Sequence, residues 1–307
     1  MLVPLNLNLN LNLNNKVVGD WWLACLCLKV LSISTSTFTS TSALMNRRSF
    51  NQKIALGSLA LGMDTPSTLS PKTHILTLSF DDGFKKSFYE IARIHEEFGL
   101  RACLNVIASG HLPEFKAVGQ YILPELLGNF DDWNTLKQRG HEIMPHSWAH
   151  LDKTKIPIEE AKELILKCLD YFETHLEGYK SHQAVYNFPF NASNEELDLF
   201  TLTRVKAIRT GGWMVLKDTS VNPLPGNPQT RRLGCWSQGP ENIDHWVEDQ
   251  INTFVSSRGG WLILNLHGLD GEGWGPVSAG YLRDLLRRLS HIDYLDLLPA
   301  GVVMNRK

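Results

Sequence analysis

The stretch HILTLSFDDGF, residues 74–84, decides the fold of this chain. Its mostly apolar run ends on two adjacent acids and a glycine, and the chain continues as KKSFYEIARIHEEFG, residues 85–99. In that second segment apolar side chains recur every three or four residues from Phe88 to Phe98, which is the spacing of one helix face. RACLNVIA, residues 101–108, has the composition of another strand. Together the three segments predict one βαβ unit.

The alternation of apolar runs and amphipathic segments continues along the chain, without a change in composition that would mark a second domain. Roughly seven or eight such units favour either a parallel barrel or a doubly wound α/β sheet. Further strands are predicted at 141–146, 184–190, 206–212 and 260–268, and further helices at 157–176, 195–203, 243–257 and 281–292.

The composition is that of a folded soluble protein. Of the 307 residues 43% are hydrophobic and 20% are charged, and the formal net charge is -2. This charge argues against a surface that binds polyanions, so we expect no nucleic-acid partner. The five cysteines are irregularly spaced, which fits neither a zinc-cysteine cluster nor a disulfide scaffold.

The first part of the chain has little capacity to build a core. Residues 5–14 repeat Leu-Asn, and residues 33–42 are almost all Ser and Thr. Between them WWLACLCLKV, residues 21–30, is apolar but shorter than the roughly 20 residues that span a bilayer. We interpret residues 1–44 as low-complexity sequence outside the fold, and Met45 is a candidate for the true start of translation.

The segment MNRRSFNQKIALGSLALGM, residues 45–63, places Arg47 and Arg48 before an apolar stretch. This arrangement resembles a twin-arginine export signal, and the alternative is a basic patch before an ordinary buried helix. We interpret residues 45–72 as an export signal and linker, and we expect a periplasmic or extracellular location. Cleavage of the signal stays open, and an uncleaved signal would be the only membrane-embedded segment that we expect.

Polar side chains follow three of the predicted strands at the point where each strand ends. Asp81 and Asp82 come after ILTLSF, His146 and His150 come after HEIM, and His267 comes after WLILNL. The carboxyl ends of parallel strands form the site-bearing face of α/β barrels and sheets. We therefore expect these five side chains to meet at one rim.

Two histidines and a carboxylate can hold a catalytic zinc ion with one open position. Zinc lowers the pKa of a bound water to roughly 7, so such a site requires no serine or cysteine nucleophile. Asp81 and Asp82 point in different directions as neighbours at a strand end, so one can ligate while the other accepts a proton. His267 can then protonate the leaving atom. Two rivals remain: the facial triad of non-haem iron oxygenases, which usually lies in antiparallel folds, and a catalytically silent sugar-binding module.

The segments LSFDDGF, RGHEIMPHSWAH and LILNLH, in this order, resemble the polysaccharide deacetylases of the NodB-homology type, carbohydrate esterase family 4. The resemblance extends from residue 73 to the end, so we expect 73–307 to be the catalytic domain. It implies a distorted parallel (β/α) barrel with about seven strands. It also implies hydrolysis of an N-acetyl group on an amino sugar polymer, or in some members of an O-acetyl ester.

The resemblance also assigns roles to the five side chains. Asp81 matches the catalytic base, Asp82 matches a metal ligand, and His267 matches the general acid. His146 and His150 match the two histidine ligands. One divalent metal ion is therefore the expected cofactor, with zinc the expected metal.

One motif departs from the common pattern of the family. Many members have R-x-P-Y where this chain has NFPF, so Asn187 replaces an arginine that holds the base and Phe190 replaces a tyrosine. The chain is closer to the F-A-Y-P-Y-G variant. Arg209, Arg231 and Arg232 are candidates to replace the missing arginine. The backbone N–H near Phe190 can still donate to an oxyanion, because that role does not depend on the side chain.

Aromatic residues near strand ends can stack on sugar rings, although ordinary packing is the commoner role of tryptophan. Trp148, Trp213, Trp236 and Trp274 lie in such places, and among them we choose Trp213. We group Phe190, Trp213 and Arg209 as the residues expected to bind the oxyanion or the substrate.

The sequence thus predicts a hydrolase that acts on carbon-nitrogen bonds other than peptide bonds. Its expected reaction is metal-dependent removal of acetyl groups, N-acetyl foremost, and its expected partner is an acetylated polysaccharide. The alternatives are a catalytically silent exported glycan-binding protein and a hydrolase of other carbon-nitrogen amide bonds.

Overall fold

The computed structural model describes residues 72–217, 219–226 and 230–306. The Leu-Asn repeat, the Ser/Thr tract and the twin-arginine-like segment lie outside the described residues, as do the expected boundaries at residues 44 and 45. Among the helices of the described part, none is long and apolar enough to cross a membrane.

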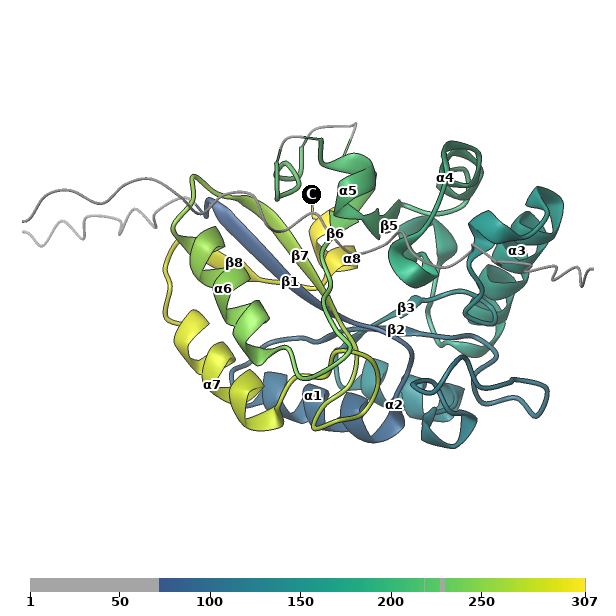
Figure 1. Ribbon diagram of the computed structural model, residues 1–307, viewed down its shortest axis with the longest axis horizontal. Helices are drawn as coiled ribbons and strands as arrows, with labels where there is room; N and C mark the ends of the chain where they lie inside the picture. Colours follow the sequence, from purple (N-terminus) through teal and green to yellow (C-terminus); the bar gives the residue numbers. More distant parts are fainter. Residues whose placement is uncertain (1–71, 218, 227–229, 307) are drawn as a thin grey trace, which may run out of the picture. The chain divides into compact units, whose positions relative to one another are not determined.

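Strands and helices alternate along the described chain, as predicted (Figure 1). The strands are β1 (His74–Phe80), β2 (Cys103–Val106), β3 (Glu142–Pro145), β4 (Val185–Asn187), β5 (Ala207–Gly211), β6 (Arg232–Cys235), β7 (Gly260–Leu266) and β8 (Leu295–Leu297). The α-helices are α1 (Lys85–Glu96), α2 (Phe130–Gln138), α3 (Ile158–His175), α4 (Glu195–Leu202), α5 (Gly212–Val215), α6 (Asp244–Val255), α7 (Ala279–Leu289) and α8 (Ala300–Met304). Short 3-10 helices are η1 (Pro124–Leu126), η2 (Lys153–Lys155), η3 (Ser181–Gln183) and η4 (Pro189–Asn191).

Every strand ladder in the described residues is parallel, which confirms the α/β class and the parallel arrangement. One sheet has the order β3-β2-β1-β7, and β8 pairs with the amino-terminal half of β1. A second sheet has the order β4-β5-β6. A bridge between Trp236 and Leu264 continues the second sheet onto β7. The strands therefore follow one another as in a distorted barrel, with a seam between β3 and β4 that no ladder closes in the described residues.

The apolar pattern of the sequence predicts neither β6 nor β8. β6 has the sequence RLGC and β8 has the sequence LDL, so both are short and one contains a glycine. Segments of three or four residues carry too little alternation for a periodic pattern to be recognised. Their positions are set by tertiary pairing with β5 and β1.

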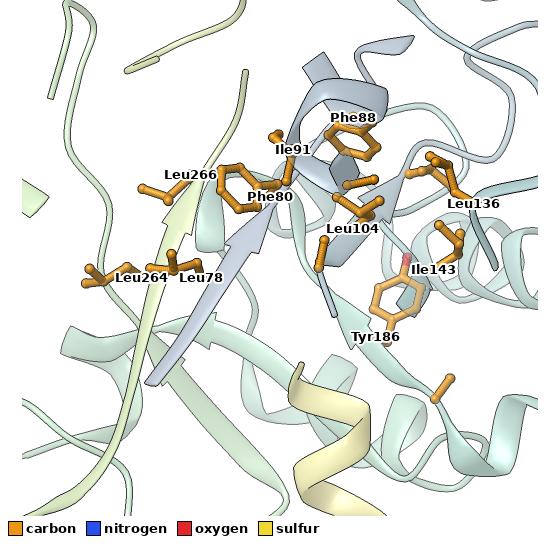
Figure 2. Close-up of a cluster of buried hydrophobic side chains, with 14 of the residues drawn as sticks. Leu78, Phe80, Phe88, Ile91, Leu104, Leu136, Ile143, Tyr186, Leu264 and Leu266 are labelled. Atoms are coloured by element: carbon orange, nitrogen blue, oxygen red, sulfur yellow. The ribbon is translucent and has the colours of Figure 1, made fainter. Parts of the chain in front are cut away.

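The helix-facing side of β1 and β7 forms the main hydrophobic core. The parallel register places Leu78 beside Leu264 and Phe80 beside Leu266, and Figure 2 shows Phe80 between Leu266 and Ile91 of α1. In Figure 1 the helices α1, α6 and α7 cover this side of the two strands. Full burial of each such side chain stabilises the fold by about 1.5–3 kcal/mol. For this reason the apolar face of the helix packs against the apolar run of the strand.

The opposite face of β1 points into the barrel, and its character changes along the strand. Ile75 packs against apolar residues of the other strands, including Trp261. Four residues after Ile75, Ser79 accepts hydrogen bonds from other strands, and Asp81 lies just beyond the strand end. Because side chains alternate along a strand, Ile75, Ser79 and Asp81 share this inner face. The barrel interior is therefore apolar at the amino end and polar at the carboxyl end, where the site lies.

Candidate metal centre

The turn after β1 separates the two adjacent acids. The N–H of Asp81 still donates to the carbonyl of Leu266 at 2.9 Å, so Asp81 continues the strand ladder. Asp82 and Gly83 then have φ values of 80° and 93°, in the left-handed region. A side chain at Gly83 would also contact Trp133 at 3.3 Å, so glycine suits both the conformation and the packing. This turn points the carboxylate of Asp82 towards the histidines.

Asp82, His146 and His150 form the one group of potential metal ligands found in the described residues, with ligand atoms within 4.8 Å of one another. The Oδ1 atom of Asp82 lies 3.4 Å from Nε2 of His146 and 3.3 Å from Nε2 of His150. Ligands bonded at about 2.1 Å to one tetrahedral ion lie roughly 3.4 Å apart. The same Oδ1 is buried and accepts no hydrogen bond in the described residues. These residues therefore fit a single divalent ion.

The two histidines are positioned by a turn rather than by a helix. Ser147 and His150 have left-handed φ values of 72° and 51°, and the N–H of His150 donates to Oγ of Ser147 at 3.0 Å. Nδ1 of His146 lies 3.1 Å from the carbonyl oxygen of Asn187, to which it donates. Because Nδ1 carries the proton, Nε2 of His146 presents a lone pair to the metal position.

Burial keeps His150 suitable as a ligand. It lowers the pKa of His150 to about 4, against the opposing attraction of Asp82. The imidazole is therefore neutral at neutral pH, and a neutral imidazole is the form that binds metals. Burial alone would raise the pKa of Asp82, but the neighbouring histidines outweigh it and hold the pKa well below its usual range.

The second acid, Asp81, is buried and accepts hydrogen bonds from three strands. Its Oδ1 accepts from Nδ2 of Asn105 at 2.7 Å, and its Oδ2 accepts from Nη2 of Arg209 at 2.6 Å and from Nδ2 of Asn265 at 2.8 Å. Oδ2 also lies 3.6 Å from Nε2 of His146. Burial is the largest effect and would raise the pKa of Asp81, but the charge and hydrogen bond of Arg209, together with His146 and His267, outweigh it and lower the pKa. Asp81 is therefore an ionised carboxylate beside the metal position.

Arg209 is the arginine that reaches Asp81. It lies on β5 directly opposite Asn187 of β4 in the parallel register, so its guanidinium enters the barrel one strand away from the position of the family arginine. Arg231 donates instead to backbone carbonyls, and Arg232 pairs with Asp198. Arg209 is fully buried and bonds to the carboxylate of Asp81. It does not reach the surface that a substrate would contact, so the structure does not place it with Phe190 and Trp213.

Replacing Arg209 with methionine is expected to destabilise the protein by about 3–5 kcal/mol, because the carboxylate of Asp81 would remain buried without its cation. Denaturant unfolding with the metal removed would measure the loss. The matched control is Arg204→Met, since Arg204 is exposed, and it is expected to change the free energy of unfolding by less than about 0.5 kcal/mol. An equal effect in both variants would contradict the role of Arg209.

His267 follows β7 and lies within electrostatic range of both acids. Burial lowers its pKa, and the charges of Asp82 and Asp81 partly oppose this effect. Its Nδ1 is buried and has no hydrogen-bond partner in the described residues. Trp274 packs edge-on against the imidazole, with ring centroids 5.6 Å apart. The structure thus brings His267 to the same rim as the metal ligands.

Phe190 and Trp213 are the large exposed aromatic side chains that the structure places after β4 and β5. Phe190 is 54% exposed, has a φ of 56°, and packs against the His150 ring at 4.8 Å between centroids. Trp213 is 61% exposed on α5. Trp148 is buried, and Nε1 of Trp236 donates to the carbonyl of Ser220. Phe190 therefore lies beside the metal ligands.

The sequence analysis did not identify the buried amides that bond to Asp81, or the one that bonds to Asn265 behind it. Asn105, Asn191 and Asn265 are all buried and hydrogen-bonded within the barrel. Asn105 and Asn265 interrupt the apolar strands CLNV and GWLILNL. A polar side chain inside a buried strand was the available signal, because burying an amide is costly without a partner.

Comparison with known proteins gives a family match for part of the chain and several solved structures with a similar fold. Residues 69–203, somewhat less than half of the chain, match the family model described as polysaccharide deacetylase. The comparison with curated proteins gives no match.

Among solved structures, a presumed polysaccharide deacetylase from Mycobacterium smegmatis has a TM-score of 0.51 at 13% identity, covering 76% of this chain and 90% of that one. A 4-alpha-glucanotransferase from Thermococcus litoralis has a TM-score of 0.52 at 12% identity, covering 77% of this chain and 41% of that one. A peptidoglycan deacetylase from Bacillus subtilis has a TM-score of 0.48 at 18% identity, covering 76% and 91%. At these identities the likeness concerns the fold. The match to the polysaccharide deacetylase model covers residues 69–203, which include Asp81, Asp82, His146 and His150.

Proposed function

We propose that the protein is a metal-dependent hydrolase that removes acetyl groups, N-acetyl foremost, from a polysaccharide or amino sugar polymer. The observation that carries this proposal is the cluster of Asp82, His146 and His150 with a second carboxylate beside it. Oδ2 of Asp81 lies 3.6 Å from Nε2 of His146. A ligand set and an adjacent ionised acid are the components that hydrolysis of an amide requires.

The proposed cofactor is one divalent ion, with zinc preferred because two imidazoles and one carboxylate are a common catalytic zinc set. Asp82, His146 and His150 would hold it. When bound, the ion supplies a Lewis acid and acidifies water at neutral pH. The protein contributes the buried, neutral imidazole of His150 and the fixed tautomer of His146, both of which favour binding.

The remaining residues provide the proton transfers. Asp81 accepts a proton from the water that attacks the acetamide carbonyl, and Asn105, Arg209 and Asn265 keep this carboxylate oriented. As the carbon-oxygen bond forms and the carbon-nitrogen bond breaks, the protonated form of His267 donates a proton to the departing nitrogen. Protonation of His267 and release of the proton held by Asp81 then return both groups to their starting state. The products are acetate and an amine on the sugar.

The turn at Phe190 provides the proposed contact to the developing oxyanion. The N–H groups of Asn191 and Ala192 donate to Phe188 and Pro189, whereas the N–H of Phe190 has no backbone acceptor in the described residues. We assign this N–H as an oxyanion donor. The motif here follows the F-A-Y-P-Y-G variant more closely than R-x-P-Y, and the exposed faces of Phe190 and Trp213 are proposed to stack on sugar rings.

The experiment that tests this function is an acetate-release screen with bound metal measured on the same sample. Peptidoglycan, chitin fragments, poly-N-acetylglucosamine and acetylated xylan would be the substrates. We expect acetate release from at least one amino sugar polymer, loss of release after chelation, and recovery with zinc. Glycan binding without acetate release would instead support a silent binding protein, and release from xylan alone would support an O-acetyl esterase.

We further propose that the protein is exported to the periplasm or beyond. This rests on the twin-arginine-like segment at residues 45–63. Fractionation of cells that produce the chain from Met45 would test it, and recovery of the protein in the cytoplasmic fraction alone would oppose it.

A further inference from the structure

A row of buried side-chain amides crosses the barrel interior at the level of the site. Nδ2 of Asn187 donates to Oδ1 of Asn105 at 2.9 Å, and Nδ2 of Asn105 donates to Oδ1 of Asp81 at 2.7 Å. On the other side of Asp81, Nδ2 of Asn265 donates to Oδ2 at 2.8 Å. Nδ2 of Asn191 then donates to Oδ1 of Asn265 at 3.0 Å. All five residues are buried, and the proposed mechanism uses Asp81 alone among them as a reacting group.

The chemistry of the groups fixes the direction of each amide. An ionised carboxylate accepts hydrogen bonds and donates none, so Asn265 must turn its NH₂ group towards Asp81. Its amide oxygen must then face Asn191, which in turn must present its own NH₂ group. The negative charge polarises this series of bonds and strengthens them in the buried interior. Asp81 therefore determines the orientation of an amide two bonds away.

Asn191 lies in the turn that presents Phe190. Phe190 and Asn191 have φ values of 56° and 52°, a conformation that phenylalanine rarely adopts and that asparagine tolerates better. Besides its bond to Asn265, Nδ2 of Asn191 donates to Oγ of Ser237 at 3.1 Å, and its Oδ1 accepts from Sγ of Cys235 at 3.2 Å. Hydrogen bonds to residues in or next to β6 and β7 therefore hold the turn, in addition to its local bonds.

We propose that Asn265 is a positioning residue that couples the carboxylate of Asp81 to the turn that carries Phe190. Its NH₂ group orients the Asp81 carboxylate, and its carbonyl oxygen holds Asn191 and, through it, the turn that places Phe190 beside His150. Asn191 is the second positioning residue in this coupling. The assignment to catalysis rests on the proposed deacetylase function, whereas the coupling itself rests on the hydrogen bonds.

The coupling predicts effects that a purely structural role would not produce. Loss of the Asn265 amide would free both the base and the turn, so kcat would fall. The three metal ligands would remain in place, because the hydrogen bonds of Asn265 go to Asp81, Asn191 and a backbone carbonyl. Loss of the Asn191 side chain would free the turn alone. Because both changes break the same bond, their effects would not multiply when combined.

The experiment compares Asn265→Ala, Asn191→Gly and the double variant with the wild type. Glycine is chosen at 191 because it adopts the left-handed conformation without strain, so this variant is expected to fold even where Asn265→Ala does not. The matched control is Asn222→Ala. Asn222 is also a buried amide, but it bonds to backbone groups of Gly234 and Trp261, towards the amino end of the barrel.

Two kinds of measurement are made on each variant. The first is acetate release, resolved into kcat and KM, with bound zinc quantified. The second is hydrogen-deuterium exchange of the segment 188–192, whose amides report the turn independently of activity.

We expect kcat to fall roughly 10–100-fold in Asn265→Ala and roughly tenfold in Asn191→Gly, with bound zinc unchanged. The double variant should match Asn265→Ala. Exchange in segment 188–192 should become roughly tenfold faster in all three, and unchanged in Asn222→Ala. Multiplying losses, or unchanged exchange in Asn265→Ala, would overturn the proposal. If the wild type releases no acetate, the deacetylase function fails, but the exchange result still decides the coupling.

Discussion

Asp81→Asn is expected to retain the metal and to lower kcat for acetate release by about 10²–10⁴-fold, the usual contribution of a general base. An amide cannot accept the proton of the attacking water. It also cannot satisfy its surroundings, because Asn105, Arg209 and Asn265 all donate to the carboxylate. In either orientation the new NH₂ group would face at least one of these donors.

The measurement is single-substrate kinetics on the polymer that the screen identifies, with bound zinc determined on the same preparation. Asn222→Ala again serves as the control for a buried polar change away from the site. A kcat within about threefold of the wild type would exclude Asp81 as the base, since that change is far smaller than general-base catalysis supplies. Loss of zinc would instead show that Asp81 is needed to hold the ion.

Asp82→Ala is expected to weaken zinc binding strongly and to abolish acetate release. Oδ1 of Asp82 lies 3.3–3.4 Å from both imidazole Nε2 atoms and accepts no other bond in the described residues, so its removal leaves two ligands in place of three. We expect zinc affinity to fall more than about 100-fold, beyond the range that changes behind the ligands produce.

Zinc titration followed by competition with a chelator would measure this loss, and the comparison with Asp81→Asn is the internal control. The two carboxylates are neighbours in sequence and equally buried, yet the variants should differ in metal content. Wild-type zinc content in Asp82→Ala would remove this residue from the ligand set. It would also remove the observation on which the proposed function depends.

The alternation of strands and helices could be predicted because it follows from the spacing of the apolar residues. The run HILTLSF is buried along its whole length, and the helix after it buries the face from Phe88 to Ile94, as burial of apolar surface requires. The residues at the strand ends could also be predicted, since parallel strands bring their carboxyl ends to one rim. His146 and His150 reach Asp82 for this reason.

The partners of Asp81 could not be predicted in the same way. The choice of Arg209 over Arg231 and Arg232 depends on the register between β4 and β5, which places Arg209 opposite Asn187. Register is set by tertiary pairing and shifts every side chain to the other face when it changes by one residue. For the same reason, the sequence alone does not predict that the side chain of Asn265 points into the barrel.

The seam between β3 and β4 gives His146 a mechanical role in addition to its chemical one. No ladder joins these strands in the described residues, and the bonds that cross the gap run from Nδ1 of His146 to the Asn187 carbonyl and from Nδ2 of Asn187 to the Pro145 carbonyl. Separating the strands here breaks side-chain bonds instead of a ladder, so we expect local opening of the barrel at this seam. His146 thus helps to hold β3 to β4 through one ring nitrogen and faces Asp82 with the other, so we expect an ion bound at this position to strengthen the link between the two strands.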